Sequence, residues 1–290
     1  MDYAIHILNT AAVFVMLALA LDLLVGLAGM MSLASGVFFG IGAYASALLV
    51  KAGWPAPGGM LVGMAVATVT SLFIALPAIR IRGVYLLIVT IAVQVIFTIV
   101  LQNWRSVTGG DAGVTNIPPF MILGVRSRGF AFLAFAAASC VFWWWLLRSL
   151  ARAPFGRVLQ AVRDDETGAV SLGKNAAAAK LAAFGLSAAI AAYAGSFYAH
   201  YAAYVDPGSF DISVSIVVLL MVMLGGAGTL TGPVIGALVL SVLPEALKFL
   251  PLPPGTAPAL RQFAYGALLL AVVFVRPQGL LGRRAVVGHV

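Results

Sequence analysis

Nine apolar runs, most of them close to 20 residues long, constrain this chain more than any other feature of its sequence. A helix needs about 20 such residues to cross the hydrocarbon core of a membrane. Only 9% of the residues are charged, whereas a soluble domain carries about 25%, so the surface must face lipid. We predict an all-α polytopic membrane protein of about 8–10 transmembrane segments. We expect one transmembrane domain covering 1–290. The runs occupy 5–25, 31–50, 59–79, 84–101, 130–147, 181–203, 212–224, 233–250 and 261–275.

The basic residues predict which side of the membrane each loop occupies. The net charge of +8 would suggest nucleic acid for a soluble protein, but in a membrane protein it reflects Lys and Arg in cytoplasmic loops. Alternate loops hold eleven and six of the 17 basic residues. The richer group places the loop 148–180 and the C-terminus inside, and the loop 102–129 outside. Nine crossings would put the N-terminus outside. The first run lacks a basic leader and a cleavage site, so we expect a retained helix.

Ionisable groups within the apolar runs are few, and each allows two interpretations. Asp22 and Glu245 would either bind a substrate ammonium or cation, or lie near the headgroups as helix-end acids. His200 would either relay protons or lie among aromatic residues at the interface. A single cysteine, Cys140, forms no internal disulfide, and no metal-binding spacing occurs. We therefore expect no metal and no cofactor.

A glycine-rich segment interrupts the apolar pattern at 225–233. Gly and Pro would break a helix here, and irregular backbone at membrane depth survives only in protein or beside a wet cavity. The segment is therefore a candidate transport pathway or gate. Small residues spaced four apart also allow helix backbones to approach closely. The predicted pathway and gate residues are Gly36, Gly40, Gly225, Gly226, Gly228, Gly232 and Pro233.

The loop 148–180 is the only long polar stretch on the predicted inner side. Its apolar residues recur near helical spacing, which predicts one or two short amphipathic helices ending near Gly173. Such a segment either lies on lipid headgroups or docks a soluble partner. The stretch 168–175 also matches G-x-x-x-x-G-K but lacks the final Ser or Thr. A phosphate-binding loop needs that hydroxyl and a preceding buried strand, and the charged residues 163–166 cannot form one.

Several motifs together resemble the M-type permease of the high-affinity branched-chain amino acid ABC transporter family. The stretch 26–36 reads Gly-Leu-Ala-Gly-Met-Met-Ser-Leu-Ala-Ser-Gly, and 223–233 reads Met-Leu-Gly-Gly-Ala-Gly-Thr-Leu-Thr-Gly-Pro. The other matching segments are 39–44, 82–85, 108–113, 154–157, 161–166, 171–173 and 276–282.

This resemblance implies a bacterial inner-membrane, multi-pass importer subunit with a fold like that of the vitamin-B12-importer (type II) permeases. It implies alternating access, a second H-type permease, two ABC ATPase subunits and a periplasmic substrate-binding protein. It also makes the loop 148–180 the coupling helix that docks on the ATPase, although the family pattern E-A-A-x-x-x-G is only partly kept. Glu166 lies one position early, and Gly168 replaces the first alanine. The expected coupling residues are Arg157, Arg163, Asp164, Asp165, Glu166, Ala169 and Gly173.

Two other classes of function stay open at this point. An ion-coupled secondary transporter would need intramembrane charges near the midplane, for which only Asp22 and Glu245 are candidates. A membrane scaffold would have no need of a broken glycine-rich segment. Related permeases carry branched-chain amino acids, other amino acids, urea or amides, and the sequence does not select among them. We expect the chain itself to catalyse no reaction, with ATP hydrolysed by partner subunits.

Overall fold

The computed structural model describes residues 2–80, 84–122, 125–126, 129–247, 266–267, 274 and 279–281. Its long helices are α1 (Asp2–Asp22), α2 (Ser35–Lys51), α3 (Ala56–Arg80), α4 (Val84–Asn103), α6 (Phe130–Arg152), α9 (Ala176–Ala202), α10 (Ile212–Gly225) and α11 (Thr231–Leu247). Shorter helical pieces are η1 (Leu23–Leu27), α5 (Arg105–Thr108), η2 (Gly110–Ala112), α7 (Pro154–Asp164), α8 (Glu166–Ser171) and η3 (Pro207–Phe210). The strands are β1 (Val114–Thr115), β2 (Met121–Ile122), β3 (Val125–Arg126) and β4 (Tyr204–Val205).

The predicted all-α polytopic fold is confirmed. Within the described ranges, six helices are long and apolar enough to cross a membrane, and two shorter apolar ones cover Ser35–Lys51 and Thr231–Leu243. Eight of the nine apolar runs therefore correspond to helices. The ninth run, 261–275, lies almost entirely outside the described residues. Several other residues also lie outside the described residues: Arg82, Gly83, Lys248, Arg261, His289, the basic residues after 274 and most of the motif 276–282. The side chain of Glu245 is not described either.

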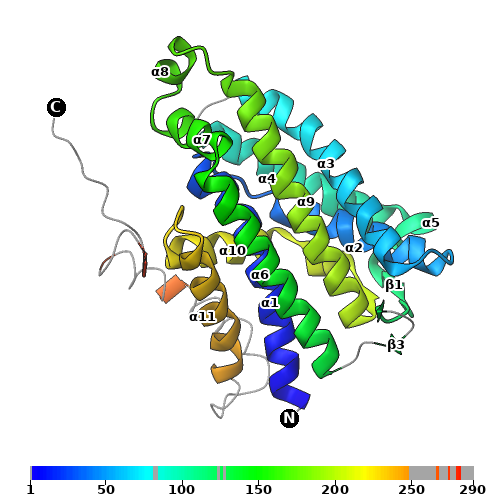
Figure 1. The fold of residues 1–290 in the computed structure, drawn as a ribbon. Coiled ribbons are helices and arrows are strands. Elements are labelled where there is room, and N and C mark those ends of the chain that lie inside the picture. The colour runs from blue at the N-terminus through cyan, green and yellow to red at the C-terminus, as the bar shows by residue number, and fades with distance from the viewer. Residues whose placement is uncertain are drawn as a thin grey trace.

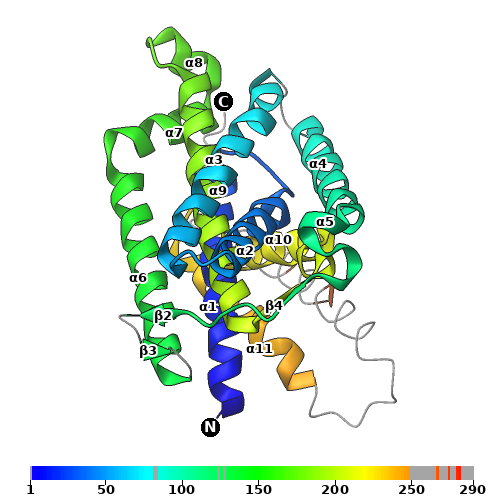
Figure 2. The same cartoon turned by 90° about the vertical axis from the view of Figure 1, so that its right-hand side faces the viewer.

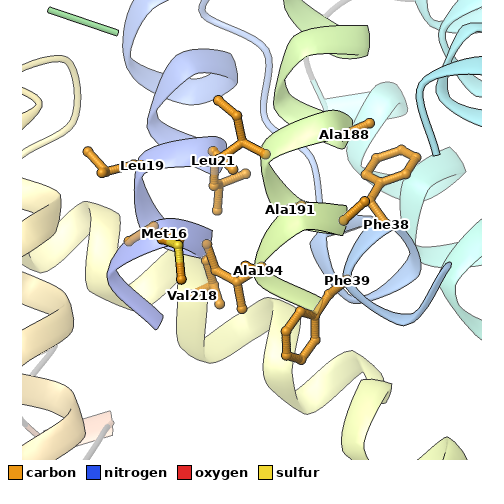
Figure 3. Close-up of a cluster of buried hydrophobic side chains, with 14 of the residues drawn as sticks. Met16, Leu19, Leu21, Phe38, Phe39, Ala188, Ala191, Ala194 and Val218 are labelled. Atoms are coloured by element: carbon orange, nitrogen blue, oxygen red, sulfur yellow. The ribbon is translucent and has the colours of Figure 1, made fainter. Parts of the chain in front are cut away.

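The helices α1 and α9 form the centre of the bundle. About 83% of the α1 span and 61% of the α9 span are buried, so other helices surround both (Figure 1). Their contacts are apolar and close: Met16 and Leu21 of α1, Ala191 of α9 and Val218 of α10 meet in one cluster (Figure 3). Because membrane helices gain no hydrophobic driving force from lipid, such small-residue packing is what holds them together.

Two glycines let α2 and α9 touch through their backbones. A Cβ atom on Gly42 would overlap Ala192, and one on Gly195 would overlap the carbonyl oxygen of Phe39. The hydroxyl of Ser196 donates to the Gly42 carbonyl at 3.0 Å across the same contact. Small residues thus allow close backbone contact between α2 and α9, although through Gly42 and Gly195 and not through the predicted Gly36 and Gly40.

The ends of the helices gather into two opposite groups (Figure 1). At one end, Nδ1 of His6 lies 2.7 Å from the Tyr201 hydroxyl, and β1 pairs antiparallel with β4 through Val114 and Val205. A second short ladder, β2 with β3, pairs Met121 with Arg126. The start of α1 therefore lies at the same end as the β1–β4 ladder of the loop 102–129, as an even number of crossings between them requires. At the other end lie α7 and α8.

His200 is buried between this outer loop and the bundle. Its Nδ1 donates to the carbonyl of Pro118 at 2.9 Å, and its Nε2 lies 2.9 Å from the Ser46 hydroxyl. The side chain is only 3% exposed, so it is an internal crosslink of the loop rather than a residue at an open interface. Because both ring nitrogens of His200 have partners within the protein, we assign the side chain a structural role and not proton relay.

Candidate functional site

The loop 148–180 folds as the two predicted amphipathic helices, α7 and α8. Pro154 occupies the first turn of α7, where its missing N–H costs nothing, and Leu159 and Val162 bury one face. The helix ends at Asp164. The next residue, Asp165, caps α8 by accepting a hydrogen bond from the Gly168 N–H at 3.0 Å. Ala169 turns inward to pack with Val162, and the chain then turns at Gly173 with φ +75°.

The predicted coupling residues divide into internal and exposed groups. Glu166 forms an ion pair with Lys180 of α9 at 2.6 Å, which fixes α8 to the bundle. Asp165 is an exposed helix cap, and Ala169 is buried. Arg157, Asp164 and Gly173 are exposed. All four consecutive charges, 163–166, have partners within the chain: Arg163 pairs with Asp164, Asp165 caps α8, and Glu166 pairs with Lys180.

Arg163 joins α7 to the end of the first span. Its Nη1 donates to the Gly26 carbonyl at 2.6 Å, and its Nε donates to Asp164 at 2.8 Å. The Gly26 carbonyl is free to accept because it lies in the last turn of the π-helical segment 23–27, where carbonyls have no intrahelical donor. Gly29, with φ +69°, lies directly against the Arg163 side chain, where a Cβ would collide. The only local feature of the sequence that corresponds to this contact is the pair of glycines, Gly26 and Gly29, which Arg163 approaches.

Asp22 links the same turn to the glycine-rich segment. Its carboxylate accepts hydrogen bonds from the Gly228 N–H at 2.7 Å and the Leu230 N–H at 3.2 Å. The side chain is fully buried. Leu230 has φ +59°, a strained conformation for a non-glycine residue that the carboxylate helps to hold. Asp22 is thus a buried side chain that caps the loop 226–230 from within the protein.

The glycine-rich break is shorter than the predicted segment 225–233 and lies within it. Only 226–230 are irregular, since Gly225 ends α10 and both Gly232 and Pro233 lie in the first turn of α11. The break sits against Gly26, at the α7 end of the first span. Pro233 is tolerated in α11 because the first N–H groups of a helix have no intrahelical partner.

Close backbone contact between α10 and α11 explains the helical glycines. A Cβ on Gly225 would overlap the Gly232 carbonyl, and one on Gly236 would overlap the Met221 carbonyl. The segment 279–281 closes the same corner: the N–H groups of Leu280 and Leu281 donate to the carbonyls of Leu224 and Gly225 at 2.8 and 3.0 Å. These bonds satisfy carbonyls left open at the end of α10.

Gly36 and Gly40 of α2 are not part of this corner and lie against α4. A Cβ on Gly36 would approach the Gln94 amide oxygen of α4 to 2.9 Å, and one on Gly40 would approach the Phe97 ring to 2.6 Å. The seven predicted pathway residues therefore fall into two groups, Gly36 and Gly40 facing α4, and the rest at the α10–α11 corner.

The stretch 168–175 begins inside α8 and runs past its end, and its last glycine, Gly173, is exposed. A phosphate-binding loop instead follows a buried strand and opens a helix with its glycines. The local geometry is that of a helix end.

Comparison with known proteins agrees with this architecture. The family model described as branched-chain amino acid transport system, permease component, matches residues 3–273. The chain belongs to this family. The permease resemblance read from the motifs is confirmed.

Individual permeases of this family are also similar to the chain in sequence. The chain is 31% identical over 96% of its length to the high-affinity branched-chain amino acid transport system permease protein LivM of Escherichia coli K12, covering 69% of that protein. It is 26% identical over 91% of its length to the autoinducer 2 import system permease protein LsrC of Escherichia coli O9:H4, covering 76% of it. It is 27% identical over 93% of its length to the high-affinity branched-chain amino acid transport system permease protein LivH of Escherichia coli K12, covering 91% of that protein. No solved structure matches significantly, so the likeness to the vitamin-B12-importer permeases stays a prediction.

Sequence reasoning missed two features of this permease. Leu172 and Val170, treated as part of an amphipathic face, point outward with 79% and 53% of their surface exposed. Gln94 of α4 is fully buried, although a lone glutamine in an apolar run carries no motif.

Proposed function

We propose that this permease is one of two membrane-spanning subunits of a bacterial ATP-driven importer for branched-chain amino acids or related small polar solutes. It works by alternating access as a single domain, 1–290, in the inner membrane. Its partners are an H-type permease, two ABC ATPase subunits and a periplasmic binding protein. The chain holds no cofactor and performs no covalent chemistry, because ATP is hydrolysed by the partner subunits. Family membership and the LivM and LivH relatives support this assignment.

The observation that carries the proposal is an apolar tip on an otherwise polar loop. Leu172 is 79% exposed and follows α8, on the part of the chain that charge places in the cytoplasm. An exposed leucine and valine in a ring of polar residues are typical of an interface core with a polar rim. We assign Val170, Leu172, Gly173 and Arg157 to the ATPase-docking surface, and Asp165, Glu166 and Ala169 to shaping it.

The side of α7 that faces the bundle could transmit motion to the membrane-spanning helices. Arg163 donates to Gly26, Gly26 packs against Gly228, and Asp22 holds the loop 226–230. A displacement of α7 would thus reach the α10–α11 corner through direct contacts. We assign Gly225, Gly226, Gly228, Gly232 and Pro233 to that moving corner and Gly36 and Gly40 to the pathway.

An ion-coupled transporter is the competing function. It needs an intramembrane charge available to an ion, but Asp22 is already bound to two backbone N–H groups. The two mechanisms also differ in their energy source, which an experiment separates.

The test is to purify the complex with Leu172→Asp and to measure how much ATPase subunit remains bound. We expect at least a tenfold loss of affinity, because truncating a central interface residue costs about 2 kcal/mol or more. The matched control is Ser106→Asp, which adds the same charge at an exposed residue of α5 at the opposite end of the bundle and should retain the ATPase. Uptake of labelled leucine into proteoliposomes should require internal ATP and survive an ionophore. Uptake driven by an ion gradient without ATP would refute the proposal.

A further inference from the structure

Helix α4 is the least enclosed of the long spans. Only 22% of its span is buried, against 83% for α1, and it stands beside the bundle in Figure 2. Large apolar side chains cover its outer face, among them Ile88, Ile96 and Ile99. Its attachment to the fold therefore depends on the narrow strip of residues that face inward.

That strip carries polar side chains, although it lies within an apolar span. Thr90 and Gln94, one helical turn apart, are both fully buried. The Gln94 Nε2 donates to the Phe210 carbonyl at 2.6 Å, and its Oε1 accepts from the Ser215 hydroxyl at 3.3 Å. Buried polar groups of this kind are costly in a membrane and are retained for function.

The partners of these side chains are the starts of two broken helices. Gly36 is the second residue of α2, and its N–H, which has no intrahelical acceptor, donates to the Ser215 hydroxyl at 2.8 Å. Just before α2, the Leu33 N–H donates to the Thr90 hydroxyl at 3.0 Å. Phe210 ends η3, two residues before α10 begins. Gln94 of α4 thus bonds to the start of α10, and Ser215 of α10 carries the connection on to the start of α2, 179 positions away in the chain.

The surface that receives α4 is shaped by glycine. Gly36 makes room for the Gln94 amide and Gly40 for the Phe97 ring, so neither position presents a side chain that would interlock with α4. The Gln94 amide and the Phe97 ring fill the space left by these glycines, so the contact between α4 and α2 depends on these side chains and on the hydrogen bonds that cross it.

From these contacts we propose that Gln94 is a latch, whose hydrogen bonds hold α4 closed over the starts of α2 and α10 and whose release opens the translocation path between them. The inference rests on the proposed transport function and assigns it a gate. Thr90 and Ser215 are the positioning residues of the latch. When α4 moves away, the Phe210 carbonyl, the Ser215 hydroxyl and the Gln94 amide become available to a polar solute.

The first test measures opening without requiring the substrate. In a Cys140→Ser background, Leu33→Cys places a thiol at a residue that is 6% exposed beneath α4, while keeping the backbone bond to Thr90. The assembled complex in membrane vesicles is treated with a water-soluble methanethiosulfonate. Gln94→Leu should raise the labelling rate about tenfold, because it removes two buried hydrogen bonds. The control Thr98→Val removes a hydroxyl that bonds only within α4, to Gln94 O, and should leave the rate unchanged. Equal rates in Gln94→Leu and the parent would overturn the latch.

The second test covers the case in which Gln94→Leu does not insert. The pair Gln94→Cys and Ser215→Cys is bridged with a short bifunctional methanethiosulfonate, which should stop uptake until a reductant restores it. The control pair Ser139→Cys and Tyr193→Cys, at a 2.7 Å contact between α6 and α9, should leave uptake intact when bridged. Undiminished uptake by the transporter with a bridged 94–215 pair would refute the gate.

The two tests also separate the latch from the proposed function. If Gln94→Leu raises the labelling rate as expected but no amino acid is taken up by the parent transporter, the latch stands and the substrate assignment fails.

Discussion

Asp22 is the side chain on which the corner between α1, α10 and α11 depends most. Its carboxylate accepts from Gly228 at 2.7 Å and from Leu230 at 3.2 Å, and the side chain is fully buried. A hydrogen bond to a charged group contributes about 1.5–3 kcal/mol. Asp22→Asn keeps one acceptor but turns an NH₂ group toward the second N–H. We therefore expect the free energy of unfolding to fall by about 1.5–3 kcal/mol, and by about 3 kcal/mol or more in Asp22→Ala.

The assay is a denaturing-detergent titration of the purified permease, with the native Cys140 as reporter. Its thiol bonds the Ala12 carbonyl at 3.3 Å between α6 and α1, so a thiol-reactive dye detects separation of these helices. Asp165→Asn is the matched control, because Asp165 caps α8 at an exposed position and Asn caps helices equally well. If Asp22→Asn were as stable as the control, the carboxylate would not hold the glycine-rich loop.

Three further outcomes follow from the same structure. In a Cys140→Ser background, Ser171→Cys should react with impermeant thiol reagents only from the cytoplasm, and reaction from the periplasm would reverse the orientation. Gly195→Val should lower stability by about 1–3 kcal/mol or more through overlap with α2, measured by the detergent titration, whereas Gly185→Ala, whose nearest neighbour would be a methyl group at 3.3 Å, should be tolerated. Lys174→Ala should leave the ATPase activity of the assembled complex close to wild type, and its complete loss would show that 168–175 binds a phosphate.

The sequence predicted the helices well because each apolar run needs only length and composition to be recognised. The two helices of 148–180 were also predictable, since Leu159, Val162 and Ala169 recur at helical spacing. Small residues at 36, 40, 232 and 236 indicated close contacts, although not which helices would meet.

The sequence could not predict contacts between residues that lie far apart in the chain. Asp22 and Gly228 are separated by 206 positions, and nothing local shows that a helix-end carboxylate will cap a distant loop. The same holds for Arg163 and Gly26, which lie 137 positions apart. Leu172 fitted an amphipathic pattern, but α8 ends at Ser171 and the side chain falls outside the helix, so it points to solvent.

The central claim is that motion passes from the ATPase through α7 to the glycine-rich corner. The hydrogen bond from Arg163 to the Gly26 carbonyl joins α7 to that corner. The direct measurement is the number of solute molecules taken up per ATP hydrolysed, in proteoliposomes holding the complete transporter. Arg163→Ala removes the 2.6 Å bond to Gly26 while leaving the Leu172 tip in place. The account predicts that the ATPase stays bound and hydrolyses ATP while uptake per ATP falls severalfold, with Arg163→Lys restoring part of the ratio through a single hydrogen bond. An unchanged ratio in Arg163→Ala would contradict it.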